Sequence, residues 1–387
     1  MSRQLTPNNG VLLALLLVLF MQSSLLAAAT TTNLAVNTNN QQVVLGVNAA
    51  GYATVNTVAT TTLAKNVKTI TISATNSDGV TVDLSLITKR AYPKLVSAQI
   101  LTGSGDDIVY GSFINDTINT GEGNDTIYCS PGNDSIDGGA DFDYLDVISS
   151  GGRATLSNAI LRDGACRSIS IKGIETVIVN AANAAIALNL DTRNFSGRTE
   201  ILGSRFNDKI VTGPGNDFVV GNGGSDYIST GDGDDIIIDD SLYPATTLAG
   251  GFGRDSIYAG NGNDQIFING GLMNFIDAGD GDDYVDASGA LVPTSVIIDD
   301  DYGDDYYSLS NGNDIVYGFD GADQIFAGDG KDLIDYSDTD GPIYADGGDG
   351  DDTIIGSDGD DIIFGGSGNN RITGGPGNDL IDGFFEP

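Results

Sequence analysis

The sequence contains no histidine and no tryptophan, and it has only 17 lysines and arginines against 54 aspartates and glutamates. The absence of histidine excludes the Ser-His-Asp and Cys-His nucleophiles, the His-Glu-x-x-His zinc site and the commonest general base. The net charge of −37 excludes binding to a nucleic-acid backbone through the charge of the chain itself. Cysteine is also scarce. Cys129 and Cys166 either pair in an oxidising compartment or remain two small buried thiols.

Acidic charge is concentrated in the C-terminal half of the chain. Residues 210–387 carry 37 acidic and three basic side chains, whereas residues 30–102 carry two acidic and five basic ones. Hydrophobic residues make up 40% of the 387 residues, so a core can form if the acidic groups are neutralised. The C-terminal half therefore needs a cation.

Residues 1–29 have the three parts of a secretory signal peptide. Arg3 supplies the positive charge, Val11–Phe20 the apolar segment and Ala27–Ala29 the small residues of a cleavage site. An uncleaved membrane anchor is the alternative, but the apolar run ends at Met21, short of the ~20 residues that a span needs. We therefore expect a secreted protein, extracellular or at the cell surface, with no transmembrane span after cleavage.

A nine-residue repeat accounts for about half of the chain. It has glycine at the fourth place in 17 of 22 units, and an aliphatic residue at the eighth place in all units except that of Tyr307. The 22 units cover 198 residues in five blocks, which are 102–146, 203–238, 250–286, 300–344 and 347–382. Such a strict period predicts a structure built from stacked, nearly identical units.

Aspartate occupies the sixth place in 19 of the 22 units, and the exceptions are Asn274, Gly341 and Asn370. These aspartates are the candidate metal ligands: Asp107, Asp116, Asp125, Asp134, Asp143, Asp208, Asp217, Asp226, Asp235, Asp255, Asp264, Asp283, Asp305, Asp314, Asp323, Asp332, Asp352, Asp361 and Asp379.

The composition of the repeat predicts how it folds. A glycine-rich hexamer can turn tightly and expose its carbonyls, and the triplet that follows places one apolar residue inward between two outward ones, as in a short strand. Two nonapeptides would make one coil, so that every second unit stacks on the same edge at the ~4.8 Å spacing of neighbouring strands. Within the blocks, nine pairs of aspartates are then stacked: 107/125, 116/134, 125/143, 208/226, 217/235, 264/283, 305/323, 314/332 and 361/379.

Stacked carboxylates repel one another. Two of them ~5 Å apart cost about 3 kcal/mol at an effective dielectric constant near 20. A divalent cation between the turns would convert this repulsion into coordination and would stabilise only the folded form. Carboxylates and backbone carbonyls are hard oxygen ligands, which favour calcium over zinc or copper, and also over magnesium with its strict octahedral geometry.

Three of the units, GGDGDDTII (347–355), GSDGDDIIF (356–364) and GGPGNDLID (374–382), resemble the nonapeptides of the repeats-in-toxin (RTX) family, also called hemolysin-type calcium-binding repeats. The resemblance implies an all-β fold, a right-handed parallel β-roll or β-solenoid, with several Ca²⁺ ions between successive turns. It also implies that the 19 aspartates and the turn carbonyls are the ligands. Sites at Asn274, Gly341 and Asn370 are expected to be weak or empty.

The remaining segments also indicate β-structure. Residues 30–101 form a small irregular β-rich N-terminal region with strands predicted over 68–74 and 80–88, and residues 147–202 form a β-rich spacer with strands predicted within 168–180 and 184–191. Both segments would cover or continue the roll, since the ends of solenoids need caps. Residues 102–146 and 203–382 carry the repeats, and 383–387 are a tail.

These features predict a secreted calcium-ion-binding repeat protein that is not an enzyme. It would fold into a rigid β-roll on binding Ca²⁺ and serve a structural or adhesive role at the cell surface or in the matrix, with extracellular polysaccharide or surface components as partners. The alternative is an RTX-bearing polysaccharide lyase or glycosidase that uses carboxylates without histidine. A pore-forming toxin is disfavoured, because residues 30–101 are too short and too polar to supply membrane helices.

Overall fold

The computed structural model describes residues 33–38, 40–74, 77–239, 253–271, 273–290, 294–299 and 301–383. The predicted signal peptide, residues 1–29, lies outside the described residues. Within these ranges the regular structure is β-strand throughout, apart from one 3₁₀ turn, η1 (Ala64–Asn66). The same ranges contain no helix that is long and apolar enough to span a membrane. The predicted all-β class is confirmed.

The chain divides into two compact units, of which the first comprises Met1–Leu145 and Ser168–Ile174. Its larger sheet is parallel and pairs, in order, β1 (Asn33–Thr38), β5 (Thr69–Ala74), β7 (Ser97–Ser104), β9 (Asp116–Glu122), β11 (Ser135–Ala140) and β15 (Arg167–Lys172). Its second parallel ladder pairs β2 (Gln42–Val47), β6 (Thr81–Asp83), β8 (Ile108–Tyr110) and β10 (Thr126–Tyr128). Two antiparallel strands, β3 (Tyr52–Val55) and β4 (Val58–Leu63), extend from β2.

The second unit comprises Asp146–Arg167 and Glu175–Pro387, and it contains two long parallel ladders. One ladder pairs β13 (Gly152–Ser157), β17 (Leu188–Asn194), β19 (Lys209–Val211), β21 (Tyr227–Asp232), β23 (Ser256–Asn261), β25 (Met273–Asp280), β27 (Ser295–Asp299), β29 (Ile315–Tyr317), β32 (Leu333–Asp335), β35 (Thr353–Ile355) and β37 (Arg371–Thr373), with β14 (Ile160–Asp163) antiparallel to β13.

The other ladder pairs β16 (Thr176–Asn180), β18 (Arg198–Leu202), β20 (Phe218–Val220), β22 (Ile236–Ile238), β24 (Gln265–Phe267), β26 (Tyr284–Asp286), β28 (Tyr306–Ser308), β30 (Gln324–Phe326), β33 (Tyr344–Asp346), β36 (Ile362–Phe364) and β38 (Leu380–Asp382). A short pair, β31 (Asp329–Gly330) and β34 (Asp349–Gly350), joins two turns. Strand β12 (Tyr144–Ile148) crosses the division between the units.

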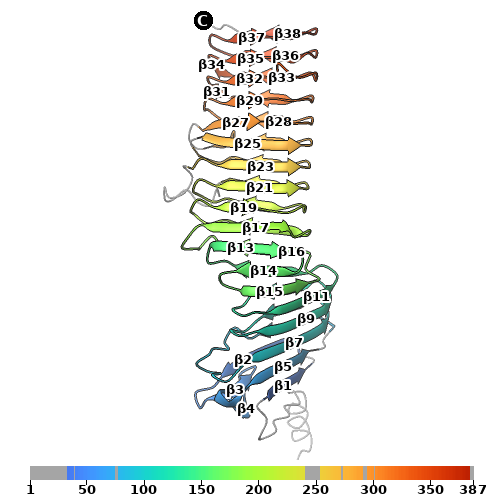
Figure 1. Ribbon diagram of the computed structural model, residues 1–387, viewed down its shortest axis with the longest axis vertical. Coiled ribbons are helices and arrows are strands. Elements are labelled where there is room, and N and C mark those ends of the chain that lie inside the picture. Colours follow the sequence, from blue (N-terminus) through green and yellow to red (C-terminus); the bar gives the residue numbers. More distant parts are fainter. Residues whose placement is uncertain are drawn as a thin grey trace, which may run out of the picture. The chain divides into compact units, whose positions relative to one another are not determined.

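The register of the second unit confirms that two nonapeptides make one coil. Strand β20 pairs with β22 through Phe218 and Ile236, which are 18 residues apart, and β28 pairs with β30 through Tyr306 and Gln324 at the same interval. Figure 1 shows the strands of this unit stacked one above another from β17 to β37. Parallel pairing through consecutive coils gives the predicted β-roll.

Each coil is held by the inward residue of its short strands. Side chains at the eighth place of the repeat are buried between the ladders, and so is Tyr307, the one aromatic residue at that place. The exceptions are Ile372 in β37, which is only partly buried, and Ile381 in β38, 45% of whose surface is exposed. Burying one such side chain contributes about 1.5–3 kcal/mol, which opposes the entropy cost of ordering nine residues but does not exceed it.

Strands outside the repeat differ in part from the prediction. Strand β5 confirms the strand predicted over 68–74, whereas the one predicted over 80–88 ends at Asp83, because the Asp83 carboxylate accepts a hydrogen bond from the N–H of Ser85 and starts a turn. The single strand predicted within 168–180 is two strands, β15 and β16, because Gly173 (φ +57°) turns the chain between them. The strand predicted from residue 184 begins only at Leu188.

Both cysteines, Cys129 and Cys166, are disulfide-bonded, which resolves the choice between a disulfide and two thiols.

Candidate metal centre

The sixth-place aspartates lie at the start of the short strands, where each glycine-rich turn ends. Of the 19 aspartates, 18 are buried, and only Asp379 is partly exposed. A carboxylate loses the hydration that stabilises its charge when it is buried, so each of these groups needs hydrogen bonds or a cation. Their burial is the feature that separates them from an ordinary acidic surface.

Each of these carboxylates is linked to the coil before it by one of its two oxygens, except that of Asp116, which accepts hydrogen bonds from Ser112 and Ser130 instead. The backbone N–H of Asp217, for example, donates to Oδ1 of Asp235 over 2.7 Å. The same bond, 2.7–3.2 Å long, joins all nine pairs predicted from the spacing: 107/125, 116/134, 125/143, 208/226, 217/235, 264/283, 305/323, 314/332 and 361/379. The aspartates therefore stand in two columns, one along each ladder.

Four further pairs continue the columns across the inserts that interrupt the repeat. They are 226/255, 235/264, 283/305 and 332/352, with Oδ1 accepting the backbone N–H over 2.6–3.1 Å. The sequence frame missed them because it paired units only within one block, and these partners belong to different blocks, 20 to 29 residues apart. The signal that could have found them is the pattern Asp-x-aliphatic, which resumes after each insert.

The three units without a sixth-place aspartate differ from one another. Asn274 and Asn370 occupy the expected position, because each accepts the N–H of the preceding coil's aspartate, Asp255 and Asp352 respectively. Gly341 does not occupy it. An insert of two residues shifts that coil, so that Ile343 stands at the sixth place and donates its N–H to Asp361.

The second carboxylate oxygen, Oδ2, is buried and accepts no hydrogen bond in many of these aspartates. This holds for Asp107, Asp125, Asp217, Asp235, Asp264, Asp283, Asp314, Asp323, Asp332 and Asp352. A buried acceptor without a partner is costly and rare in folded proteins. Ten such atoms in equivalent positions indicate that something outside the chain completes them.

Burial makes the ionised form of these carboxylates unfavourable when no cation is present. Desolvation raises the pKa of Asp235 to about 8 and that of Asp283 to about 9, and the neighbouring aspartates of adjacent coils raise both further. The pKa values of Asp314 and Asp332 rise to about 7 for the same two reasons. At neutral pH these carboxylates are therefore ionised fully only when a cation is bound beside them.

Backbone carbonyls of the turns stack close to the columns. Gly260 (φ +110°) and Gly279 (φ +96°) are equivalent turn residues of consecutive coils, and a Cβ atom on Gly279 would collide with the carbonyl oxygen of Gly260. Only glycine combines this backbone conformation with so close an approach. The turns thereby bring the carbonyl oxygen of one coil against the backbone of the next.

These donors fit calcium. Among the described residues, no three carboxylates, histidines or cysteines gather into a ready-made metal site. The oxygens come instead from aspartates of consecutive coils and from turn carbonyls, all hard oxygen ligands of the kind that calcium takes in sets of six to eight. Bound calcium would supply positive charge to the partnerless Oδ2 atoms and link each coil to the next.

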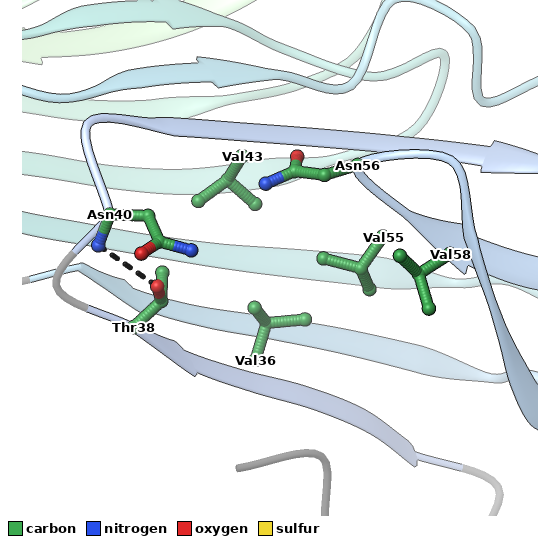
Figure 2. Close-up of a pocket in the computed structure, with 7 residues that line it drawn as sticks. All are labelled: Val36, Thr38, Asn40, Val43, Val55, Asn56 and Val58. Carbon is green, nitrogen blue, oxygen red and sulfur yellow. Dashed lines mark hydrogen bonds between the residues drawn. The ribbon is translucent and has the colours of Figure 1, made fainter. Parts of the chain in front are cut away.

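A pocket in the first unit offers no second centre. It has a volume of about 120 Å³ and is lined by four valines with Thr38, Asn40 and Asn56. Figure 2 shows these side chains, with the N–H of Asn40 bonded to the Thr38 hydroxyl over 3.0 Å. Because the lining carries no titratable group, it provides neither an acid, a base nor a charged metal ligand.

Replacing one column aspartate is expected to weaken calcium binding without disrupting the stack. In Asp314→Asn, the amide oxygen can still accept the N–H of Val296, as Asn274 already does for Asp255, but the charge is lost. We expect a several-fold higher calcium midpoint in circular dichroism and fewer bound ions by calorimetry. Asp338→Asn removes the same charge from an exposed position and is the control. Equal midpoints for both variants would contradict the assignment.

Comparison with known proteins agrees with this geometry. The family model described as RTX calcium-binding nonapeptide repeat (4 copies) matches residues 110–145, 202–237, 245–271, 299–334 and 346–381. These segments contain all the candidate aspartates except Asp107 and Asp283. A comparison with curated proteins gave no match. The stacked turns, the buried aspartate columns and the matched segments together place these repeats in the RTX calcium-binding nonapeptide family.

Proposed function

We propose that this calcium-binding repeat protein is secreted and serves as a structural or adhesive element at the cell surface or in the extracellular matrix. The observation that carries the proposal is the row of buried Oδ2 atoms without hydrogen-bond partners, which suits the coordination of calcium and not the binding of a substrate. Calcium sites of extracellular modules typically have Kd values of about 10⁻⁴–10⁻³ M, so the repeats would order only in the calcium-rich space outside the cell.

Two features support an extracellular location. The N-terminal 29 residues have the composition of a signal peptide. The disulfide state of Cys129 and Cys166 is typical of an oxidising compartment, since cytosolic thiols are kept reduced. Both point to a protein that acts after export.

We further propose that the protein is not an enzyme. The buried carboxylates of the columns are engaged in linking coils, as Asp235 links to Asp217 and Asp332 to Asp314, and the sequence has no histidine to act as a general base. The alternative, a carboxylate-dependent polysaccharide lyase or glycosidase, predicts turnover of extracellular glycans.

Incubation of the purified, calcium-loaded chain with alginate and pectin tests this choice. We expect no unsaturated product by ultraviolet absorbance and no new reducing ends over a day. A lyase or hydrolase of known activity on each polymer is the positive control. Turnover that is lost when calcium is chelated would establish the enzyme and overturn the non-enzymatic role.

A further inference from the structure

Six aromatic rings form a continuous strip on the outer face of one ladder in the second unit, which we call the aromatic strip. Its members are Phe267, Tyr284, Tyr306, Phe326, Tyr344 and Phe364, on β24, β26, β28, β30, β33 and β36. Centroids of successive rings are 5.2–5.9 Å apart, and the Tyr284 and Tyr306 rings are stacked with 5° between their planes. Every ring is half-buried, so part of each surface stays open to solvent.

The strip is regular along the roll. Each of these strands has two outward positions, and one ring occupies one of them in all six strands. The other outward position holds a polar side chain in five strands: Gln265, Asp286, Ser308, Gln324 and Asp346. Five intervals of ~4.8 Å give a strip about 24 Å long in which rings alternate with hydrogen-bonding groups.

Packing of the sheet does not require these rings. Gln265 and Gln324 stand in register with the strip's tyrosines, so the ladder accepts a polar side chain at that position. The other ladder carries a shorter run of three rings, Tyr227, Tyr258 and Phe275, with centroids 5.3 and 5.6 Å apart, and this run does not extend to Tyr317. The longer run, of six rings, is on one face.

The surroundings of the strip indicate what it contacts. The polar side chains beside the strip are amides, a hydroxyl and carboxylates, which bond to hydroxyl groups, and the outward positions of these six strands contain no basic residue. Asp286 and Asp346 lie beside the rings, in a half of the chain with 37 acidic and three basic residues. This charge repels acidic polysaccharides, nucleic acids and anionic membranes. A ligand that repeats along its length suits a strip that repeats along the roll.

We propose that the aromatic strip and the polar side chains beside it bind an uncharged, extended polysaccharide, whose C–H groups lie against the exposed parts of the rings while its hydroxyls bond to the polar side chains. The inference rests on the proposed adhesive role and names its partner class. It does not depend on which aspartates bind calcium, beyond requiring that the roll is folded.

The test compares retention of the full mature chain, in calcium, by insoluble cellulose and chitin. The variant Tyr306→Gln/Tyr344→Gln replaces two strip rings by the residue found at positions 265 and 324. The control variant Tyr258→Gln/Tyr317→Gln makes the same change on the other ladder. We expect the wild type and the control to bind at least one of the two polymers, and the strip variant to bind about tenfold more weakly. Circular dichroism in calcium checks that all three chains are folded.

Three results would overturn the inference. One is a folded wild type that binds neither polymer, and another is a strip variant that binds as tightly as the control. The third is self-association of the wild type in sedimentation that the strip variant abolishes without any glycan binding, since the strip would then join two copies of the chain. Failure of the chain to fold in calcium would instead contradict the calcium-dependent function, so the two failures are distinguishable.

Discussion

Chelation of calcium from a chain of residues 30–387 is expected to remove most of its β-sheet circular-dichroism signal. The reason is the row of buried carboxylates: 18 of the 19 candidate aspartates are buried, and ten carry a partnerless Oδ2 atom. Without calcium these groups repel one another in adjacent coils, while one inward apolar side chain per nonapeptide cannot offset the entropy of ordering the backbone. Calcium binds only the folded stack, so its binding energy is folding energy.

The measurement is a calcium titration of the chelated chain, followed by far-ultraviolet circular dichroism. We expect a cooperative rise of the β signal near millimolar calcium, with no comparable rise in magnesium, which demands octahedral coordination and releases water reluctantly. A spectrum that is already folded in chelator and unchanged by calcium would refute metal-linked folding. The repeats would then form an ordinary solenoid core.

Acidification of the calcium-free chain is expected to restore part of the lost structure. Burial raises the pKa of Asp107 and Asp264 to about 6, that of Asp323 to about 7 and that of Asp235 to about 8 in the folded chain, against about 3.9 when unfolded. A raised pKa means that the folded state binds more protons than the unfolded state. This contribution to stability is fully present below about pH 4 and is lost progressively as the pH rises through the folded-state pKa values, up to about pH 8.

Calcium binding has the opposite dependence, because a proton and a calcium ion compete for the same carboxylate. We expect the calcium-free chain to gain β signal between about pH 8 and pH 5, and calcium binding to release protons and to weaken over the same interval. Circular dichroism in chelator measures the first effect, and calorimetry in buffers of different ionisation enthalpy measures the second. Light scattering is the control for aggregation and should not increase, because the chain approaches its isoelectric point near 4.1. A calcium affinity that increases as the pH falls would contradict competition between protons and calcium for these carboxylates.

The repeat predicted the coil and the aspartate columns because the path of each coil depends only on residues close together in the sequence. A turn of fixed length followed by one inward residue gives every coil the same path, so residues equally spaced in the sequence are stacked in the structure. Asp217 and Asp235 could be paired from their numbers alone, and their hydrogen bond is present. Asp226 and Asp255 could not be paired in this way, because 29 residues separate them and the coil resumes its register only after the insert.

Strands without the repeat were harder to place. The hydrogen bond that an aspartate accepts from the coil before it needs only a backbone N–H as donor, which any residue except proline can supply. Val80 and Leu188 therefore donate to Asp107 and Asp208, although neither belongs to a nonapeptide. Inward–outward alternation alone admits many registers, and only the neighbouring coil selects one. The nine-residue pattern did not predict the aromatic strip for a related reason. Its rings alternate between two outward places of the unit, and they become neighbours only when the coils are stacked.

The hydrogen bonds of the columns all point the same way along the chain. Asp235 receives the N–H of Asp217, and Asp217 in turn receives that of Thr199. In the columns each coil is therefore completed by the coil that follows it, whereas the side chain before the column aspartate bonds in the opposite direction, as Asp106 does by accepting the N–H of Asn124. In a chain that emerges N-terminus first, each new coil packs onto a folded coil whose sixth-place N–H groups can donate to the new carboxylates. Assembly in the reverse order would place each column carboxylate before the N–H group that it accepts, so the direction of the column bonds favours growth from the N-terminal end.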